Sequence, residues 1–256
     1  MEYNNSIWAT IIPALLFVLY IYSRDKFKRE PKGVVFASYL LGILGGIVLV
    51  FLYLILHISA IYDAPSTLGG HYIWEMVEGA CLDQIMMLIF LYLLLRYNIF
   101  ADEHTDRIVY ASCIAMGVIT TKNVVFCLMN SPSVLSQSVM RGMALIPIFF
   151  SCGIMLGYYC SSLKIKKIPF FSIKLPVLII IPIFFQCFLI YIFLFFDIQY
   201  GLTGSLLFLL FLIIVSLFIY KVCANAIETS QIRDVDEKKV KSMYDISRYI
   251  KGKKDD

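Results

Sequence analysis

Seven apolar runs, each about as long as one membrane-crossing helix, follow one another along this chain. A helix crosses a bilayer with roughly 20 apolar residues, because each residue advances it by about 1.5 Å. The runs are continuous rather than alternating, which predicts helices and not the strands of a barrel. The predicted spans are residues 7–23, 34–58, 73–97, 108–129, 139–162, 174–196 and 202–222.

The composition supports the same interpretation, because 60% of the 256 residues are hydrophobic and the mean hydropathy is +0.82. Soluble domains are about 45–50% apolar. We therefore expect an all-α integral membrane protein, with a seven-helix transmembrane bundle over residues 1–222. We expect residues 223–256 to form a charged tail. Two interpretations of this tail remain, a helix lying on anionic lipid and a solvated segment.

The basic residues lie on one side of the predicted membrane. Five of the 22 Lys and Arg lie in residues 24–33, two in 96–107, four in 163–174 and nine from Lys221 onward. The intervening loops hold none. The positive-inside rule then places the N-terminus outside and the C-terminus in the cytoplasm of a multi-pass cell-membrane protein. Residues 7–22 lack a preceding basic region, which favours an N-terminal anchor over a cleavable signal peptide.

Lys122 lies inside the predicted span 108–129. A charge near the middle of a span costs roughly 2.5–3.5 kcal/mol on insertion scales. Such a residue usually faces the bundle interior and has a partner. Two interpretations stay open at this stage, a structural ion pair and a reactive or transport site.

Asp83 is the expected partner of Lys122. It lies nine residues after Trp74, a predicted interface anchor, and therefore roughly 13 Å deep. Lys122 lies roughly 12 Å below the same surface. The two spans run in opposite directions, so the sequence predicts an ion pair at matching depth. Gln186 and His57 could border this cluster, although ordinary hydrogen bonding between helices is the simpler role for each.

Motifs for metals, cofactors and nucleic acids are missing from the sequence. The seven cysteines form no CxxC pair, and the three histidines show no HExxH spacing. There is no glycine-rich phosphate loop and no nucleic-acid signature. We therefore expect no metal, no other cofactor and no nucleic-acid partner. The expected partners are membrane lipid and, in one hypothesis below, a single-span membrane protein or peptide.

Two GxxxG pairs lie within predicted spans, Gly42 with Gly46 and Gly153 with Gly157. Small residues four positions apart let helix backbones approach closely. We interpret both pairs as packing surfaces rather than ligand sites.

Four segments, in order, resemble motifs of the PrsW family of membrane-embedded proteases, which is related to the CAAX-protease group. The resemblance covers roughly residues 20–190. The matching segments are Arg24–Pro31, a basic and acidic stretch ending in Glu-Pro; Asp106–Tyr110, similar to DGIVYG; Gly117–Phe126, similar to GFAxxENxxY; and Arg141–Tyr159, which ends in GYY.

The resemblance implies a bacterial intramembrane protease that acts on membrane-anchored substrates such as anti-sigma factors. This chain departs from the family at its polar positions. Asp106 and Asn123 match the family motifs. The departures are Asp83-Gln84 and Met87 at the family's EExxK, Lys122 at the glutamate of ENxxY, and Phe149 and Gln186 at two histidines.

Peptide hydrolysis needs an activated water, held between carboxylates or bound to a metal. A cation beside Asp83 would compete for its carboxylate and repel a catalytic metal. The first hypothesis is therefore a catalytically degenerate homologue that binds a membrane-anchored peptide or helix as a regulator or partner. Its polar site would comprise Asp83, Gln84, Lys122, Asn123 and Gln186.

Two alternatives remain, so the sequence leaves open whether the chain is an enzyme. The second hypothesis is an active protease that uses Asp83 together with Glu75, Glu78 or Asp106. The third is a small transporter or proton relay built on the polar cluster.

Overall fold

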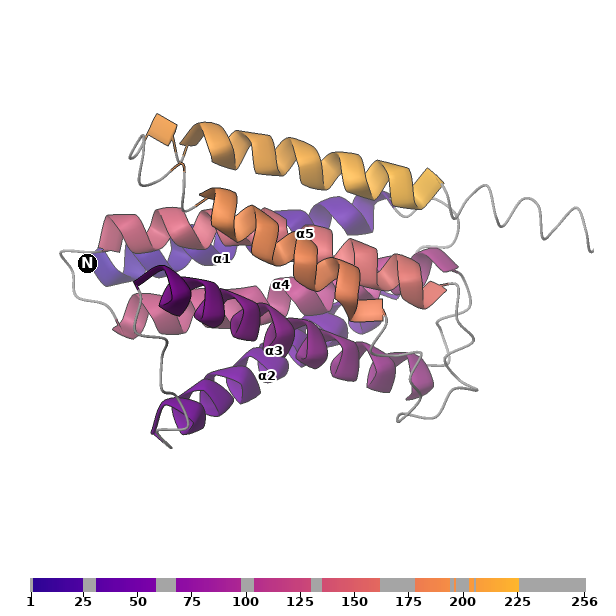
Figure 1. The fold of residues 1–256 in the computed structure, drawn as a ribbon. Coiled ribbons are helices and arrows are strands. Elements are labelled where there is room, and N and C mark those ends of the chain that lie inside the picture. Colours follow the sequence, from indigo (N-terminus) through magenta and orange to yellow (C-terminus); the bar gives the residue numbers. More distant parts are fainter. Residues whose placement is uncertain are drawn as a thin grey trace, which may run out of the picture.

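The computed structural model describes residues 2–24, 31–58, 68–97, 104–129, 135–161, 178–193, 196, 203–204 and 206–225. Its secondary structure over these residues is entirely helical, which confirms the predicted fold class. The first five helices are α1 (Glu2–Arg24), α2 (Lys32–Ile58), α3 (Leu68–Tyr97), α4 (His104–Met129) and α5 (Leu135–Ser161). Two more helices, Leu178–Phe193 and Leu206–Asn225, follow them (Figure 1).

Five helical stretches are long and apolar enough to cross a membrane, judged by length and composition. The apolar parts of the other two helices, Ile11–Ser23 and Leu178–Phe193, are shorter. Each of these helices overlaps one predicted span, although α1 and α3 both begin five residues before their predicted starts, at Glu2 and Leu68. Most of the predicted tail, from residue 226 onward, lies outside the described residues. The side of the membrane on which each loop lies stays a prediction.

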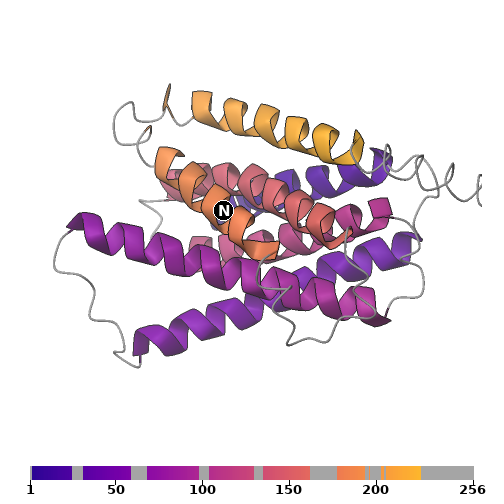
Figure 2. The ribbon, with the colours of Figure 1, turned by 45° about the vertical axis from the view of Figure 1, so that its right-hand side comes forward.

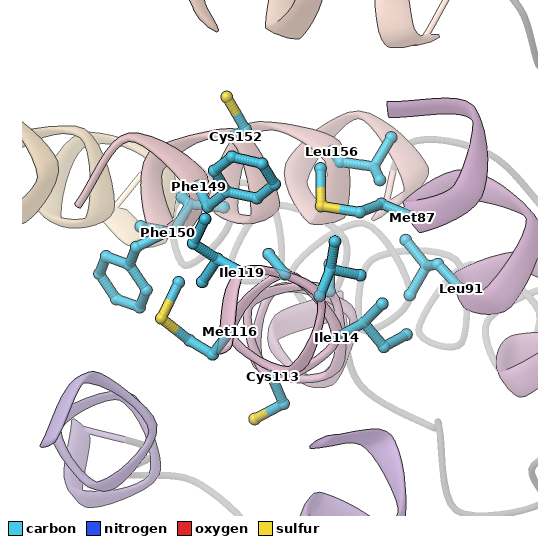
Figure 3. Packing of buried hydrophobic residues seen from close by; sticks show 14 of the residues in the cluster. Met87, Leu91, Cys113, Ile114, Met116, Ile119, Phe149, Phe150, Cys152 and Leu156 are labelled. Carbon is cyan, nitrogen blue, oxygen red and sulfur yellow. The ribbon is translucent and has the colours of Figure 1, made fainter. Parts of the chain in front are cut away.

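Helix α4 is the central element of the bundle. Residues 108–120 of this helix are all buried, and α1, α2, α3 and α5 all contact it. Figure 3 shows how apolar side chains fill the space around it, with Leu91 of α3 and Phe150 of α5 on two different sides. The polar residues carried by α4 are therefore held inside the molecule.

The helix Leu206–Asn225 lies at the edge of the bundle, opposite α2 (Figures 1 and 2). Tyr220 packs edge-on against Tyr20 of α1, and Phe208 stacks on Phe196. Leu207 and Phe218 are 68% and 65% exposed. An apolar, exposed outer face of this kind is what lipid chains would cover in a membrane.

The first GxxxG pair brings α2 against α4. A Cβ atom on Gly42 would lie 2.9 Å from the Cα of Gly117, and one on Gly46 would lie 2.6 Å from the Cβ of Thr121. The hydroxyl of Thr121 donates to the carbonyl oxygen of Ile43 at 3.3 Å. The predicted packing role of this pair is therefore confirmed.

The second GxxxG pair brings α5 against α4 in the same manner. A Cβ atom on Gly157 would lie 2.6 Å from the Cα of Ile108, and Gly153 also directly abuts the α4 backbone. Near this crossing Arg107 donates to the carbonyl oxygen of Ser161 at 2.7 Å, at the C-terminal end of α5. A cation there satisfies carbonyl groups that have no partner within the helix.

Candidate functional site

The charged residue of α4 meets the charged residue of α3 inside the bundle. The ammonium of Lys122 donates to both carboxylate oxygens of Asp83, each at 2.7 Å. The predicted ion pair is confirmed. The two side chains differ in exposure, because 24% of the Lys122 side chain is accessible and only 1% of the Asp83 side chain. Solvent or a ligand can therefore contact the pair at Lys122 but not at Asp83.

Two glutamines extend the pair into a hydrogen-bonded chain. The side-chain amide of Gln186 donates to Oδ2 of Asp83 at 2.9 Å. The amide of Gln84 in turn donates to Oε1 of Gln186 at 2.6 Å. Both glutamines are fully buried. Gln186 therefore borders the cluster, as expected, and links the helix Leu178–Phe193 to α3.

Two aromatic rings complete the surroundings of the lysine. The Nζ atom of Lys122 lies 5.3 Å from the ring centroid of Phe149 and 5.5 Å from that of Tyr53. Both distances are within the roughly 6 Å over which a ring attracts a cation. Side chains from α2, α3 and α5 therefore meet around one ammonium group carried by α4.

Sequence reasoning missed Tyr53 as a member of this site. The chain has 17 tyrosines and 20 phenylalanines, so an aromatic residue in an apolar run gives no signal by itself. The only available signal was depth, because Tyr53 lies in the outer half of the predicted span 34–58, the level at which Lys122 and Asp83 were expected.

Other sequence candidates lie elsewhere. Asn123 is buried, but as the residue after Lys122 it lies about 100° further around α4. Asp106 is buried near the opposite end of α4, roughly 24 Å along the helix from Lys122. It is therefore too far away to share a water molecule with Asp83, which corrects that candidate pairing. The side chains of Glu75, Glu78 and His57 lie outside the described residues.

Five positions singled out by sequence resemblance thus meet in one place. Residues 30–220 match the family described as "PrsW family intramembrane metalloprotease". This chain belongs to the PrsW family. Apart from Met87, the residues that the sequence resemblance placed at polar positions of the family form the cluster described above: Asp83, Gln84, Lys122, Phe149 and Gln186.

Three curated relatives are similar to this PrsW family member, and each is named Protease PrsW. The Bacillus subtilis (strain 168) protein is 24% identical over 155 residues, which are 59% of this chain and 65% of that protein. The Clostridioides difficile (strain 630) protein is 26% identical over 177 residues, 66% and 73% of the two chains. The Oceanobacillus iheyensis protein is 27% identical over 157 residues, 61% and 68%.

The match therefore spans just under two thirds of the length of the Bacillus subtilis relative. No solved structure matches the chain.

The family description implies a metal ion, and the residues of this cluster do not fit one. A catalytic metal is usually held by three or more imidazole, carboxylate or thiolate ligands. Among the described side chains, Asp83 is the one carboxylate in the cluster, and both of its oxygens accept bonds from Lys122. Among the residues described, no three His, Cys, Asp or Glu side chains come together. A fixed ammonium also opposes a second cation at this distance.

Proposed function

We propose that this PrsW family member binds a membrane-anchored peptide or single-span helix and does not hydrolyse it. The observation that carries the proposal is the bond from Lys122 to both oxygens of Asp83. A general base needs a lone pair directed at water. Three bonds from an ammonium and an amide occupy most of the acceptor sites of Asp83, and only 1% of its side chain is exposed, so it is poorly placed to activate a water molecule.

The family scaffold supports a retained binding role. Residues 30–220 match the family model. The Lys122 side chain is partly exposed, so another chain could contact the cluster at this residue. The substrate class comes from the family resemblance, so the partner is a peptide or helix anchored in the same membrane.

An active protease is the second candidate, favoured by the name of the three curated relatives. The proton-relay hypothesis loses support, because Gln84 and Gln186 continue the chain from Asp83. Amide side chains do not take up and release protons near neutral pH.

The test combines photo-crosslinking with a cleavage assay on the full chain in lipid nanodiscs. A photoreactive residue at Val125, one turn from Lys122, is compared with one at Leu44, a 53% exposed residue on the outer face of α2. Each variant is incubated with a panel of single-span peptides. We expect a peptide to be captured at Val125 and not at Leu44, with no cleavage product.

Two results would contradict the proposal. Capture at neither position, or equally at both, would mean that the cluster does not mark a binding surface. Cleavage that disappears in the Asp83→Asn variant would show that the protein is an active protease.

A further inference from the structure

We propose that Asp83, Tyr53 and Phe149 form a binding site for a primary ammonium group, which Lys122 fills from within the chain. The ligand class is a small alkylammonium ion rather than a metal. The inference goes beyond the proposed peptide binding and rests on the observed contact between Lys122 and Asp83. Its test reads stability and not cleavage, so the two can fail separately.

The contacts of Lys122 are those by which proteins recognise organic cations. One carboxylate contributes two short charge-assisted hydrogen bonds, each at 2.7 Å. The rings of Tyr53 and Phe149 lie 5.5 and 5.3 Å from the nitrogen. The three contacting side chains come from three different helices, so the site surrounds the ammonium on several sides.

Asp83 is held in place by groups other than Lys122. Gln186 donates to its Oδ2 atom at 2.9 Å. The amide of Gln186 is itself oriented by Gln84, whose Nε2 atom donates to Oε1 of Gln186 at 2.6 Å. The carboxylate therefore keeps its orientation when the lysine side chain is shortened, and the site remains formed.

Helix α4 is also unable to move into space vacated by the lysine. Thr121, the residue before Lys122, packs tightly against Gly46. A Cβ atom added to Gly46 would lie 2.6 Å from the Cβ of Thr121. A Lys122→Ala variant would therefore leave a gap beside Asp83, because a rigid site relaxes only partially around a deleted side chain. About a quarter of the Lys122 side chain is exposed, so a small molecule could enter the gap from this side.

The experiment is rescue of Lys122→Ala by an added amine, measured as melting temperature in detergent. We expect the variant to melt below the wild-type protein. Butylammonium should recover about half of that loss with saturating dependence on concentration, as for a ligand that binds only the folded state. Butanol, which lacks the charge, should not do so. The wild-type protein, whose site is filled, should show no saturable response.

The control variant Lys122→Ala/Asp83→Asn lacks the carboxylate and should not respond to butylammonium. Three results would overturn the proposal: a response that survives in this control, equal effects of butanol and butylammonium, or stabilisation of Lys122→Ala by Zn²⁺ but not by the amine. Each would show that the space beside Asp83 does not recognise an ammonium group.

A second measurement keeps the proposal falsifiable if Lys122→Ala does not fold. Lys122→Met and Phe149→Leu, with the double variant, form a thermodynamic cycle on melting temperature. A cation held by the ring predicts a smaller loss from Phe149→Leu once Lys122 has become Met. Equal losses from Phe149→Leu in both backgrounds would overturn the cation-site proposal.

Discussion

Lys122 of α4 reaches Asp83 of α3 with its ammonium 2.7 Å from both carboxylate oxygens, and only the lysine is accessible from outside. An exposed lysine can redirect its charged end toward water when its partner is lost, because its side chain is long. Asp83, with 1% of its side chain exposed, has no such freedom. The two halves of this pair are therefore not equivalent.

We expect the single variants Lys122→Met and Asp83→Leu to lower stability, and the double variant to recover much of the loss. Removing one partner of a buried pair typically costs about 3–5 kcal/mol, whereas replacing both with apolar residues is often near neutral. In a membrane protein the loss is smaller, because the unfolded chain also finds partners. Melting temperatures of all four proteins in detergent measure the effect.

Because Lys122 and Asp83 differ in exposure, the two single variants of this cycle should differ in their loss of stability. Lys122→Met should be the more damaging single change, because it leaves the enclosed carboxylate without its cation. Strictly additive losses would mean that the two residues do not interact. A larger loss in Asp83→Leu would contradict the argument from exposure.

Gln186→Leu should destabilise the protein by about 1–3 kcal/mol, the usual cost of leaving a buried polar group unsatisfied. The change removes one bond to Asp83 and leaves the amide of Gln84 without its acceptor. The double variant Gln84→Leu/Gln186→Leu should lose less than the two single losses combined. Thermal unfolding in detergent checks this, and a double variant with a fully additive loss would contradict the chain of contacts.

Gly42→Ala should lower the stability of the α2–α4 contact. The added Cβ would lie 2.9 Å from the Cα of Gly117, so backbone must shift. Forcing one extra carbon into a closed contact typically costs about 1–3 kcal/mol. Gly33→Ala is the matched control, because its Cβ would meet nothing within 4 Å.

Alanine favours a helix over glycine by up to about 1 kcal/mol, so Gly33→Ala should be neutral or stabilising. Thermal unfolding of the two variants side by side separates crowding from helix propensity. Similar melting temperatures for both variants would show that the glycine crossing is less tight than the contact distances indicate.

Reporter fusions test the predicted orientation. Fusions after Asp63 and Asn130 should report an external location, and fusions after Asp102 and Lys167 a cytoplasmic one. The physical reason is the concentration of Lys and Arg in alternate loops. One reversed reading in the series would break the seven-span topology.

Depth along a helix could be predicted from the sequence, whereas rotation about its axis could not. Counting residues from the ends of two spans placed Asp83 and Lys122 at one level, and the structure joins them. The same counting separates Asp106 from the cluster by most of the length of α4. It could not show that Tyr53 faces inward, because continuous apolar runs carry no polar face to orient them.

The glycine pairs were predictable because their signal is local. Two glycines four residues apart always lie on one side of a helix, whatever that helix contacts. The partners of Gly42 and Gly157 on α4 could not be read in the same way. They depend on which helices become neighbours, and that is decided by contacts between residues distant in the sequence.

The close crossings of α2 and α5 with α4 hold this helix in place independently of the polar side chain at residue 122. Gly42 and Gly157 lie directly against backbone atoms of α4, so these contacts do not depend on the side chain at residue 122. The side chain at residue 122 can therefore change its charge without altering where its Cα atom lies. We therefore expect α4 to keep its place when residue 122 is exchanged, even where the exchange costs stability, which would make this helix a suitable scaffold for building new sites by single substitutions.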